Sequence, residues 1–325
     1  MEKINLDHLA CNIDVESFWT KFDTICKDHG LAETMRPFIC KCQKDTNIFF
    51  EYVPGSFSFT EEYENQLFET LLGTLKKDEI LYKYTSANFI NYIMGDDISM
   101  LSIVCMNDTT ECDYADEYFK RKGLEYVFQK PEVYNIGSNI FITSFTKKCD
   151  NLTMWRLYGD ECKGVSVGFE VKDLPNGFYL AKVSYAEKDN THKELDFIKD
   201  IRNIVENNNT FYLRNFLVWK HFFKPYDYSD EDEYRLLYFL GSPVANRKWI
   251  RTNNGIITPL VSFSACYLNT EKQTYPLQIK ELYLGPKMPE KEVNKHMIEL
   301  MLNNKFGWSN KKDITISISK KNNYR

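Results

Sequence analysis

Carboxylates and an arginine alternate in the segment DEDEYRLL, residues 230–237. Alternate residues of a β-strand point to the same face of a sheet, so we expect Glu231, Glu233 and Arg235 to share one face. Three charges on one side of a core strand are costly unless they are paired or functional. Repulsion between neighbouring carboxylates favours the protonated form of one of them, which suits acid–base chemistry. We therefore treat Glu233 and Glu231 as candidate catalytic residues and Arg235 as a binding residue.

The same charged run is also compatible with a structural role or with a metal site. Glu233 and Arg235 would form a structural network if they pair with each other or with Arg156, because a buried charge needs a partner. The acidic run would instead hold Mg²⁺ in a metal-dependent nuclease, since carboxylate oxygens are the ligands this ion prefers. We favour the nuclease least, because its carboxylates are concentrated in one local segment.

A second candidate group lies in LYKYT, residues 81–85, which combines a cation with hydroxyl groups. Aromatic residues and threonine favour a strand here, and the following SANFINYI has the character of a short helix. Tyr82, Lys83 and Thr85 are expected to form a ligand-facing edge where the strand ends. The alternative is an ordinary strand whose lysine is solvated.

A third candidate group combines a hydroxyl group from one element with aromatic and basic residues from the next. Ser144 lies in the predicted strand NIFITSFT, and the predicted short helix NLTMWRLYG carries Trp155, Arg156 and Tyr158. An arginine beside a tyrosine suits an anion that adjoins an aromatic or ribose-like group. The alternative is a structural strand and helix that pack Trp155 into the core.

Several common catalytic motifs are missing. The sequence has no Gly-x-Gly-x-x-Gly, no Gly-Lys-Ser/Thr phosphate loop and no Gly-x-Ser-x-Gly elbow. Its five histidines do not pair at metal-binding spacing, and there is no Cys-x-x-Cys. We therefore expect no bound metal.

Composition indicates a folded protein without a strong electrostatic signature. The 325 residues are 43% hydrophobic and carry a formal net charge of −5, which gives no overall attraction for nucleic acid. The nine cysteines are scattered, so we expect reduced thiols and a cytoplasmic location. No apolar run approaches the length of about 18 residues that a membrane helix requires, so we expect no membrane partner.

The order of elements favours an α+β protein. Apolar residues recur at helical spacing near residues 15–25 and 60–75, whereas short strands and helices then mix without a βαβ rhythm. We expect a helical N-terminal extension over residues 1–80 and a main α+β domain over 81–325, built on a central mixed or antiparallel sheet with flanking helices. The segments 164–171 and 178–186 are expected to form a hairpin.

The motif order resembles a bacterial family called domain of unknown function 2971, over about residues 81–325. The resemblance rests on LYKYTS, MNDTTE, ITSFT, NLTMWRLYG, KGVSVGF, DEDEYRLL and LYLGP. The family pattern Asn-Asp-x-x-Glu falls on Asn107, Asp108 and Glu111. Where family members usually carry histidine in Tyr-His-Tyr-Thr, this chain carries Lys83, which cannot accept a hydrogen bond when charged.

A looser resemblance extends to ADP-ribosyltransferases, and it implies an ADP-ribosyltransferase-like fold with NAD as cofactor. Lys83 and Thr85 would hold the nicotinamide ribose, Trp155 or Tyr158 would stack on nicotinamide, and Glu233 would stabilise the oxocarbenium-like ribose. The acceptor, a protein or a nucleic acid, is left open. Such an enzyme would fit the role of a toxin or a phage-defence effector.

The competing hypothesis is a non-enzymatic sensor or interaction protein. In that case Glu233 and Arg235 form a structural network, and the helices of residues 1–80 dock a partner protein. The two hypotheses differ in whether the carboxylate of Glu233 faces a shared hollow together with Thr85.

Overall fold

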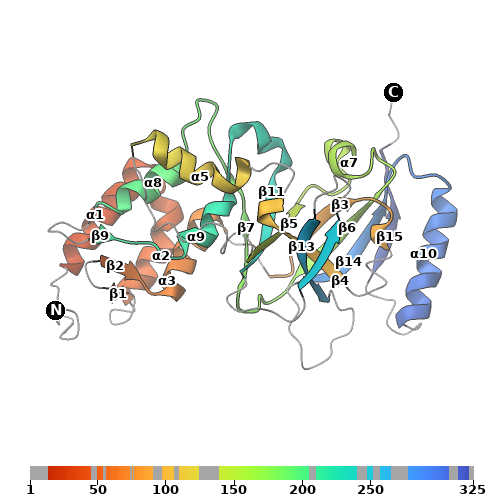
Figure 1. Cartoon of the computed structure of the whole chain (residues 1–325), viewed down its shortest axis with the longest axis horizontal. Coiled ribbons are helices and arrows are strands. Elements are labelled where there is room, and N and C mark those ends of the chain that lie inside the picture. The colour runs from red at the N-terminus through yellow and green to blue at the C-terminus, as the bar shows by residue number, and fades with distance from the viewer. Residues whose placement is uncertain are drawn as a thin grey trace. The chain divides into compact units, whose positions relative to one another are not determined.

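The computed structural model divides the chain into two compact units that are interleaved in sequence (Figure 1). The first comprises residues 1–74, 108–133 and 183–229, and the second comprises 75–107, 134–182 and 230–325. The first unit thus includes two segments beyond residue 80, whereas the predicted N-terminal extension ends at residue 80. A separate domain role for residues 1–80 stays a prediction. The structure describes residues 14–44, 50–53, 56–73, 75, 77–90, 97–105, 110–123, 139–204, 210–239, 247–251, 257–264, 277–306 and 314–321.

Helices and short strands make up the first unit. Its helices are α1 (Val15–Asp28), α2 (Ala32–Lys44), α3 (Glu61–Leu72), α5 (Thr110–Arg121), α8 (Lys193–Ile201), α9 (Phe216–Trp219) and the 3₁₀ turn η2 (Lys220–Phe222). Its strands are β1 (Phe50–Val53), β2 (Ser56–Phe59), β8 (Ser184–Tyr185), β9 (Thr210–Phe211) and β10 (Phe223–Lys224). Aromatic side chains hold these elements together: Phe18 of α1 packs against Phe59 of β2 and Phe211 of β9, with ring centroids 6.1 and 5.6 Å away.

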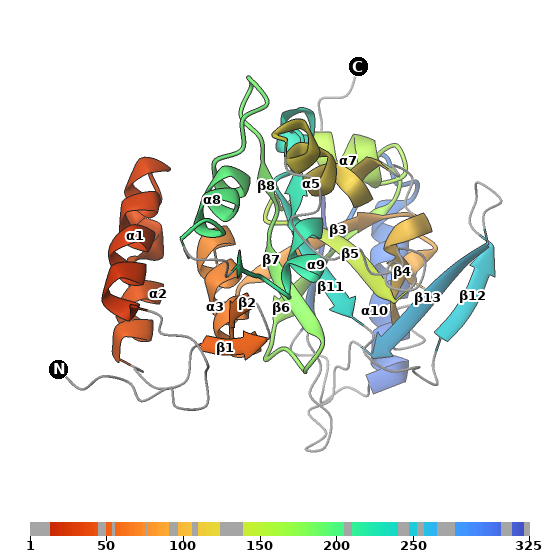
Figure 2. The same ribbon diagram turned by 60° about the vertical axis from the view of Figure 1, so that its left-hand side comes forward.

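A mostly antiparallel sheet forms the second unit (Figure 2). Its strands are β3 (Ile80–Thr85), β4 (Asp97–Ser102), β5 (Ile140–Thr146), β6 (Val165–Val171), β7 (Phe178–Lys182), β11 (Glu233–Phe239), β12 (Arg247–Arg251), β13 (Ile257–Ser264), β14 (Leu277–Leu284) and β15 (Thr315–Ile318). The helical elements are α7 (Leu152–Tyr158), α10 (Lys291–Phe306) and the 3₁₀ turn η1 (Ile103–Cys105); a further 3₁₀ turn, η3 (Tyr226–Glu231), leads into β11. Only β14 and β15 pair in parallel among the described strands of this sheet, so the predicted α+β class with a mixed, mainly antiparallel sheet is confirmed.

The sheet forks at β5. Strand β11 pairs with β5 along its whole length, and β3 and β4 therefore share the other edge of β5. Strand β3 pairs there only at Thr146, whereas β4 pairs at Ile142 and Phe141. The strands that carry the three candidate groups thus lie side by side in the order β3, β5, β11.

Two layers of side chains cover the two faces of this sheet. Leu81, Val167 and Phe169 belong to the main apolar core, which also contains Ile298 and Leu302 of α10. On the opposite face, Tyr84 packs with Met154 and Trp155 of α7 in a separate cluster. The alternation of Leu81 and Tyr84 between faces follows the period of two in a strand.

The expected hairpin between residues 164–171 and 178–186 is wrong. Strand β7 pairs with β11, whereas β6 pairs with β3 and β14.

No helix in the described part of the chain combines the length and the apolar character needed to cross a membrane.

Candidate functional site

One row of residues crosses five strands of the second unit in register. Glu233 of β11 faces Thr146 of β5, which faces Tyr82 of β3. Tyr82 in turn faces Gly168 of β6, and Gly168 faces Glu281 of β14. Directly paired residues project to the same face of a sheet, so this row places Glu233 and Glu281 on one face with Tyr82 between them.

Lys83 and Thr85 lie on the opposite face from Glu233, because they alternate with Tyr82 along β3. The contacts agree: Nζ of Lys83 donates to Oγ1 of Thr143 at 2.7 Å and lies 5.7 Å from the ring centre of Phe145. Burial lowers the pKa of Lys83 to about 8, against the influence of the Glu233 carboxylate, which raises it. The strand register therefore places Thr85 and Glu233 on opposite faces of the sheet, so they do not line the shared hollow that was expected.

A closed ion pair holds Glu233. Nε and Nη2 of Arg235 donate to its two carboxylate oxygens at 2.8 and 3.0 Å, and Oγ of Ser144 donates to Oε1 at 2.6 Å. Glu233 is 2% exposed and Arg235 is 1% exposed. Three of the predicted site residues thus meet: a buried ion pair that neutralises the carboxylate and the partly exposed Ser144 that donates to it.

Glu231 does not share a strand face with Glu233 as predicted. It ends the 3₁₀ turn η3, and Asp232 has a φ of +48°, a left-handed conformation that breaks the period of two before β11 begins at Glu233. The carboxylate of Glu231 accepts a hydrogen bond from the hydroxyl of Tyr158 in α7, and Tyr158 is 45% exposed. These two predicted residues form their own pair.

Trp155 and Arg156 have different environments although they are neighbours in α7. Trp155 is fully buried, donates from Nε1 to Asp150 at 2.8 Å, and meets the ring of Tyr84 edge-on at 4.8 Å. The alternative of a core tryptophan is therefore the one that its environment supports, whereas Arg156 is exposed.

Asn107 and Asp108 lie outside the described residues, as does the side chain of Glu111.

The acidic run before β11 is divided among different partners. Asp232 forms an ion pair with Lys182 of β7 at 2.8 Å, and Asp230 is exposed. Over the residues that the structure describes, no three His, Cys, Asp or Glu side chains converge in a way that would hold a metal ion.

Glu281 and its neighbours were not among the residues predicted for the site. The hydroxyl of Tyr82 donates to Oε2 of Glu281 at 2.8 Å, and the rings of Tyr82 and Tyr283 lie 6.2 Å apart at 69°. The one available signal was Gly168 in the middle of a strand, because a glycine there often marks the close approach of other groups.

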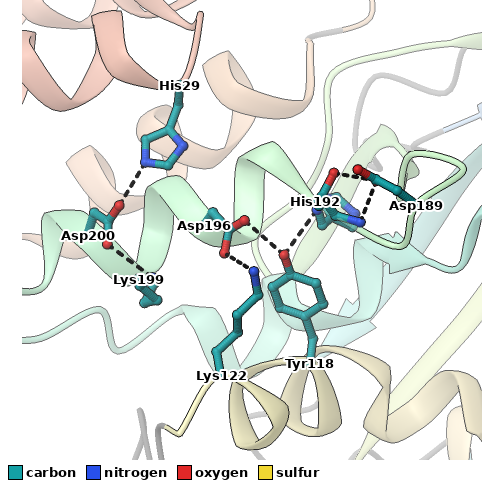
Figure 3. A network of polar contacts seen from close by, with 9 residues as sticks. His29, Tyr118, Lys122, Asp189, His192, Asp196, Lys199 and Asp200 are labelled. Carbon is teal, nitrogen blue, oxygen red and sulfur yellow. Dashed lines mark hydrogen bonds and ion pairs between the residues drawn. The ribbon is translucent and has the colours of Figure 1, made fainter.

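Polar contacts in the first unit centre on α8 (Figure 3). His29, after the end of α1, lies 2.9 Å from Oδ2 of Asp200 through Nε2. The hydroxyl of Tyr118 from α5 donates to Asp196 at 2.9 Å and accepts from the backbone N–H of His192 at 3.0 Å. These contacts join α1 and α5 to α8 and have the character of structural ties.

A buried carboxylate links α3 to the segment before α9 in the same unit. Glu64 is fully buried and accepts the backbone N–H groups of Arg214 and Asn215 at 2.9 and 2.7 Å. Burial raises the pKa of Glu64 to about 7, although both N–H groups act in the opposite direction.

Comparisons with known proteins relate part of the chain to a family. A family model described as "Protein of unknown function (DUF2971)" matches residues 154–236, about a quarter of the chain. This segment runs from α7 into β11 and contains Trp155, Arg156, Tyr158, Glu233 and Arg235. No curated protein and no solved structure matches the chain.

Proposed function

We propose that the protein is a non-enzymatic sensor or interaction protein in which Glu233 and Arg235 form a structural network. The observation that supports this proposal is the burial of both charged side chains, 2% and 1% exposed, in a two-point ion pair completed by Ser144. A carboxylate that stabilises charge on a substrate must be able to approach that substrate. The carboxylate of Glu233 contacts Arg235 and Ser144 instead.

The proposal is tested by Glu233→Gln in the full chain. Removing one partner of a buried ion pair costs about 3–5 kcal/mol of stability, because the charge of the remaining partner loses the opposite charge that offsets its burial. For a chain of 325 residues we expect the melting temperature to fall by roughly 4–7 °C. The matched control is Glu231→Gln, since Glu231 is partly exposed and accepts a hydrogen bond from the hydroxyl of Tyr158. We expect this substitution to lower the melting temperature by about 2 °C at most.

The same proteins are incubated with labelled NAD and a cell extract. The proposal expects no cleavage of NAD and no label transfer by the unaltered protein. An unchanged melting temperature for Glu233→Gln, together with NAD turnover that this substitution abolishes, would overturn the structural assignment.

ADP-ribosyl transfer is the second candidate, favoured by the adjacency of the three motif strands in the order β3, β5, β11. In this reaction the bond between ribose and nicotinamide breaks, and an acceptor nucleophile on a protein or nucleic acid bonds to the same ribose carbon. Glu233 would leave Arg235 to stabilise the positive charge on the ribose. Label transfer that depends on Glu233 is the result that would establish this activity, which would be compatible with a toxin or phage-defence role.

A further inference from the structure

Two tyrosines and a carboxylate form a cluster at the β14 end of the in-register row. The hydroxyl of Tyr82 donates to Glu281 at 2.8 Å, and the rings of Tyr82 and Tyr283 are inclined at 69° with their centres 6.2 Å apart. All three side chains are partly exposed. Inclined aromatic rings beside a carboxylate are groups that together attract an organic cation.

Gly168 makes this arrangement possible. It lies between Tyr82 and Glu281 in the register of the sheet. A Cβ atom at position 168 would lie 2.9 Å from Cβ of Glu281 and 3.1 Å from Cε1 of Tyr82. The missing side chain therefore lets the tyrosine ring cross β6 and reach the carboxylate, which indicates a built arrangement rather than a chance surface contact.

Glu281 differs from three other carboxylates of the same sheet, each of which forms an ion pair. Glu79 pairs with Lys147 at 2.6 Å, Glu170 pairs with Lys172, and Glu233 pairs with Arg235. Among the residues that the structure describes, no lysine, arginine or histidine forms an ion pair with Glu281. Its negative charge is thus available to a cation from outside the unit.

The neighbouring groups remain neutral donors. Burial, the hydrogen bond to Glu281 and the nearby Cys149 thiol raise the pKa of Tyr82. For Tyr283, the Cys149 thiol, burial and the Glu281 carboxylate raise the pKa in the same way. Both phenols therefore stay protonated and contribute hydrogen-bond donors and aromatic faces rather than charge.

We propose that Tyr82, Tyr283 and Glu281 bind a guanidinium group. Such a group is planar, stacks on aromatic faces and donates to carboxylates, so it uses both parts of the cluster. The source is either a small guanidinium compound or an arginine side chain of a polypeptide. This inference gives a partner chemistry to the proposed interaction protein and rests on that function, but it is measured at residues far along the row from Glu233.

The test is calorimetric titration of the full chain with Nα-acetylarginine amide and with the citrulline analogue, which has the same shape without the charge. We expect the arginine compound to bind and the citrulline compound to bind at least roughly tenfold more weakly, the usual effect of losing a charge-assisted hydrogen bond. Glu281→Gln should weaken arginine binding to a similar extent. Placing the same arginine in a short neutral peptide distinguishes the sources, because tighter binding of the peptide indicates a polypeptide partner.

Glu170→Gln is the matched control, since Glu170 lies on the adjacent strand β6 but is paired with Lys172. We expect this substitution to leave arginine binding unchanged. Absence of arginine binding, equal binding of citrulline, or equal losses in the two variants would each overturn the proposal. If arginine does not bind but Glu233→Gln is destabilised, the guanidinium proposal fails while the structural network of the proposed function stands. NAD turnover that depends on Glu233 would refute the proposed function whether or not arginine binds.

Discussion

The buried carboxylate of Glu64 makes the stability of the first unit depend on pH. Its pKa is about 7 in the folded chain and 4.5 in the unfolded reference, mainly because burial disfavours the charged form. A raised pKa means that the folded state holds the proton more tightly, so its stabilising effect is complete below pH 4.5 and is lost as the pH rises to 7. With 1.36 kcal/mol for each pH unit, the whole effect is about 3 kcal/mol.

Glu64→Gln isolates this contribution. Glutamine keeps the shape and one acceptor oxygen for the N–H groups of Arg214 and Asn215, but it does not titrate. Urea unfolding of both proteins from pH 4.5 to 8 should show the unaltered protein losing stability relative to the variant by about 3 kcal/mol, with most of the change below pH 7. The difference should then stay constant above pH 7.

Parallel pH profiles of the two proteins would show that the carboxylate has an ordinary pKa in the folded state. A profile in which the unaltered protein gains stability with rising pH would show that the two N–H groups outweigh burial. Either result would refute the reasoning, because both require the N–H groups to offset the cost of burying the charge.

Three further substitutions test other parts of the structure. Asp14→Ala removes the hydrogen bond from the N–H of Ser17 that caps α1, and it should cost about 1 kcal/mol in chemical unfolding. Lys83→Met removes an amine whose pKa burial lowers to about 8, so the unaltered protein should gain stability relative to the variant as the pH rises from 8 to 10.5; identical profiles would contradict the burial of the amine. Gly168→Ala should cost about 1–3 kcal/mol and weaken guanidinium binding, because its Cβ would crowd Tyr82 and Glu281.

Local patterns predicted most of the elements near the site. The β-forming residues of 139–146 indicate a strand that the structure has as β5, and the helical spacing after Asp14 indicates α1. Asp14 also caps that helix as its residue type favours. These features depend on neighbours within a few residues, so the sequence contains the information that determines them. By contrast, α2 was not predicted, and it contains Pro37, a residue that normally interrupts a helix.

The composition of the site depended on register, which local patterns do not determine. Ser144, Glu233 and Arg235 meet because β5 and β11 pair directly. Lys83 does not join them, since only the pairing of Tyr82 with Thr146 decides which face of β3 is shared with Glu233. The prediction for Glu231 was wrong because Asp232 has a left-handed backbone conformation. The residue types of the acidic run do not indicate this conformation.

The distance between the two carboxylates of the in-register row leads to a last prediction. Glu233 and Glu281 are separated by four strand-to-strand steps, or about 19 Å at the usual strand spacing. Residues this far apart without a shared partner contribute additively to stability, within about 0.5 kcal/mol. The double variant Glu233→Gln and Glu281→Gln should therefore lose the sum of the two single losses, with nearly all of it from Glu233, whose charge is paired with a buried arginine.

Arginine binding by the same proteins should follow the opposite pattern. The loss should come from Glu281, whose charge has no basic partner in the described part of the sheet, and Glu233→Gln should leave the affinity unchanged at a temperature where that variant is folded. A coupling larger than about 1 kcal/mol in either measurement would mean that the two ends of the row communicate. In that case a cation at Glu281 would influence the ion pair of Glu233, and the closed cluster would be part of a response to the ligand rather than a fixed support.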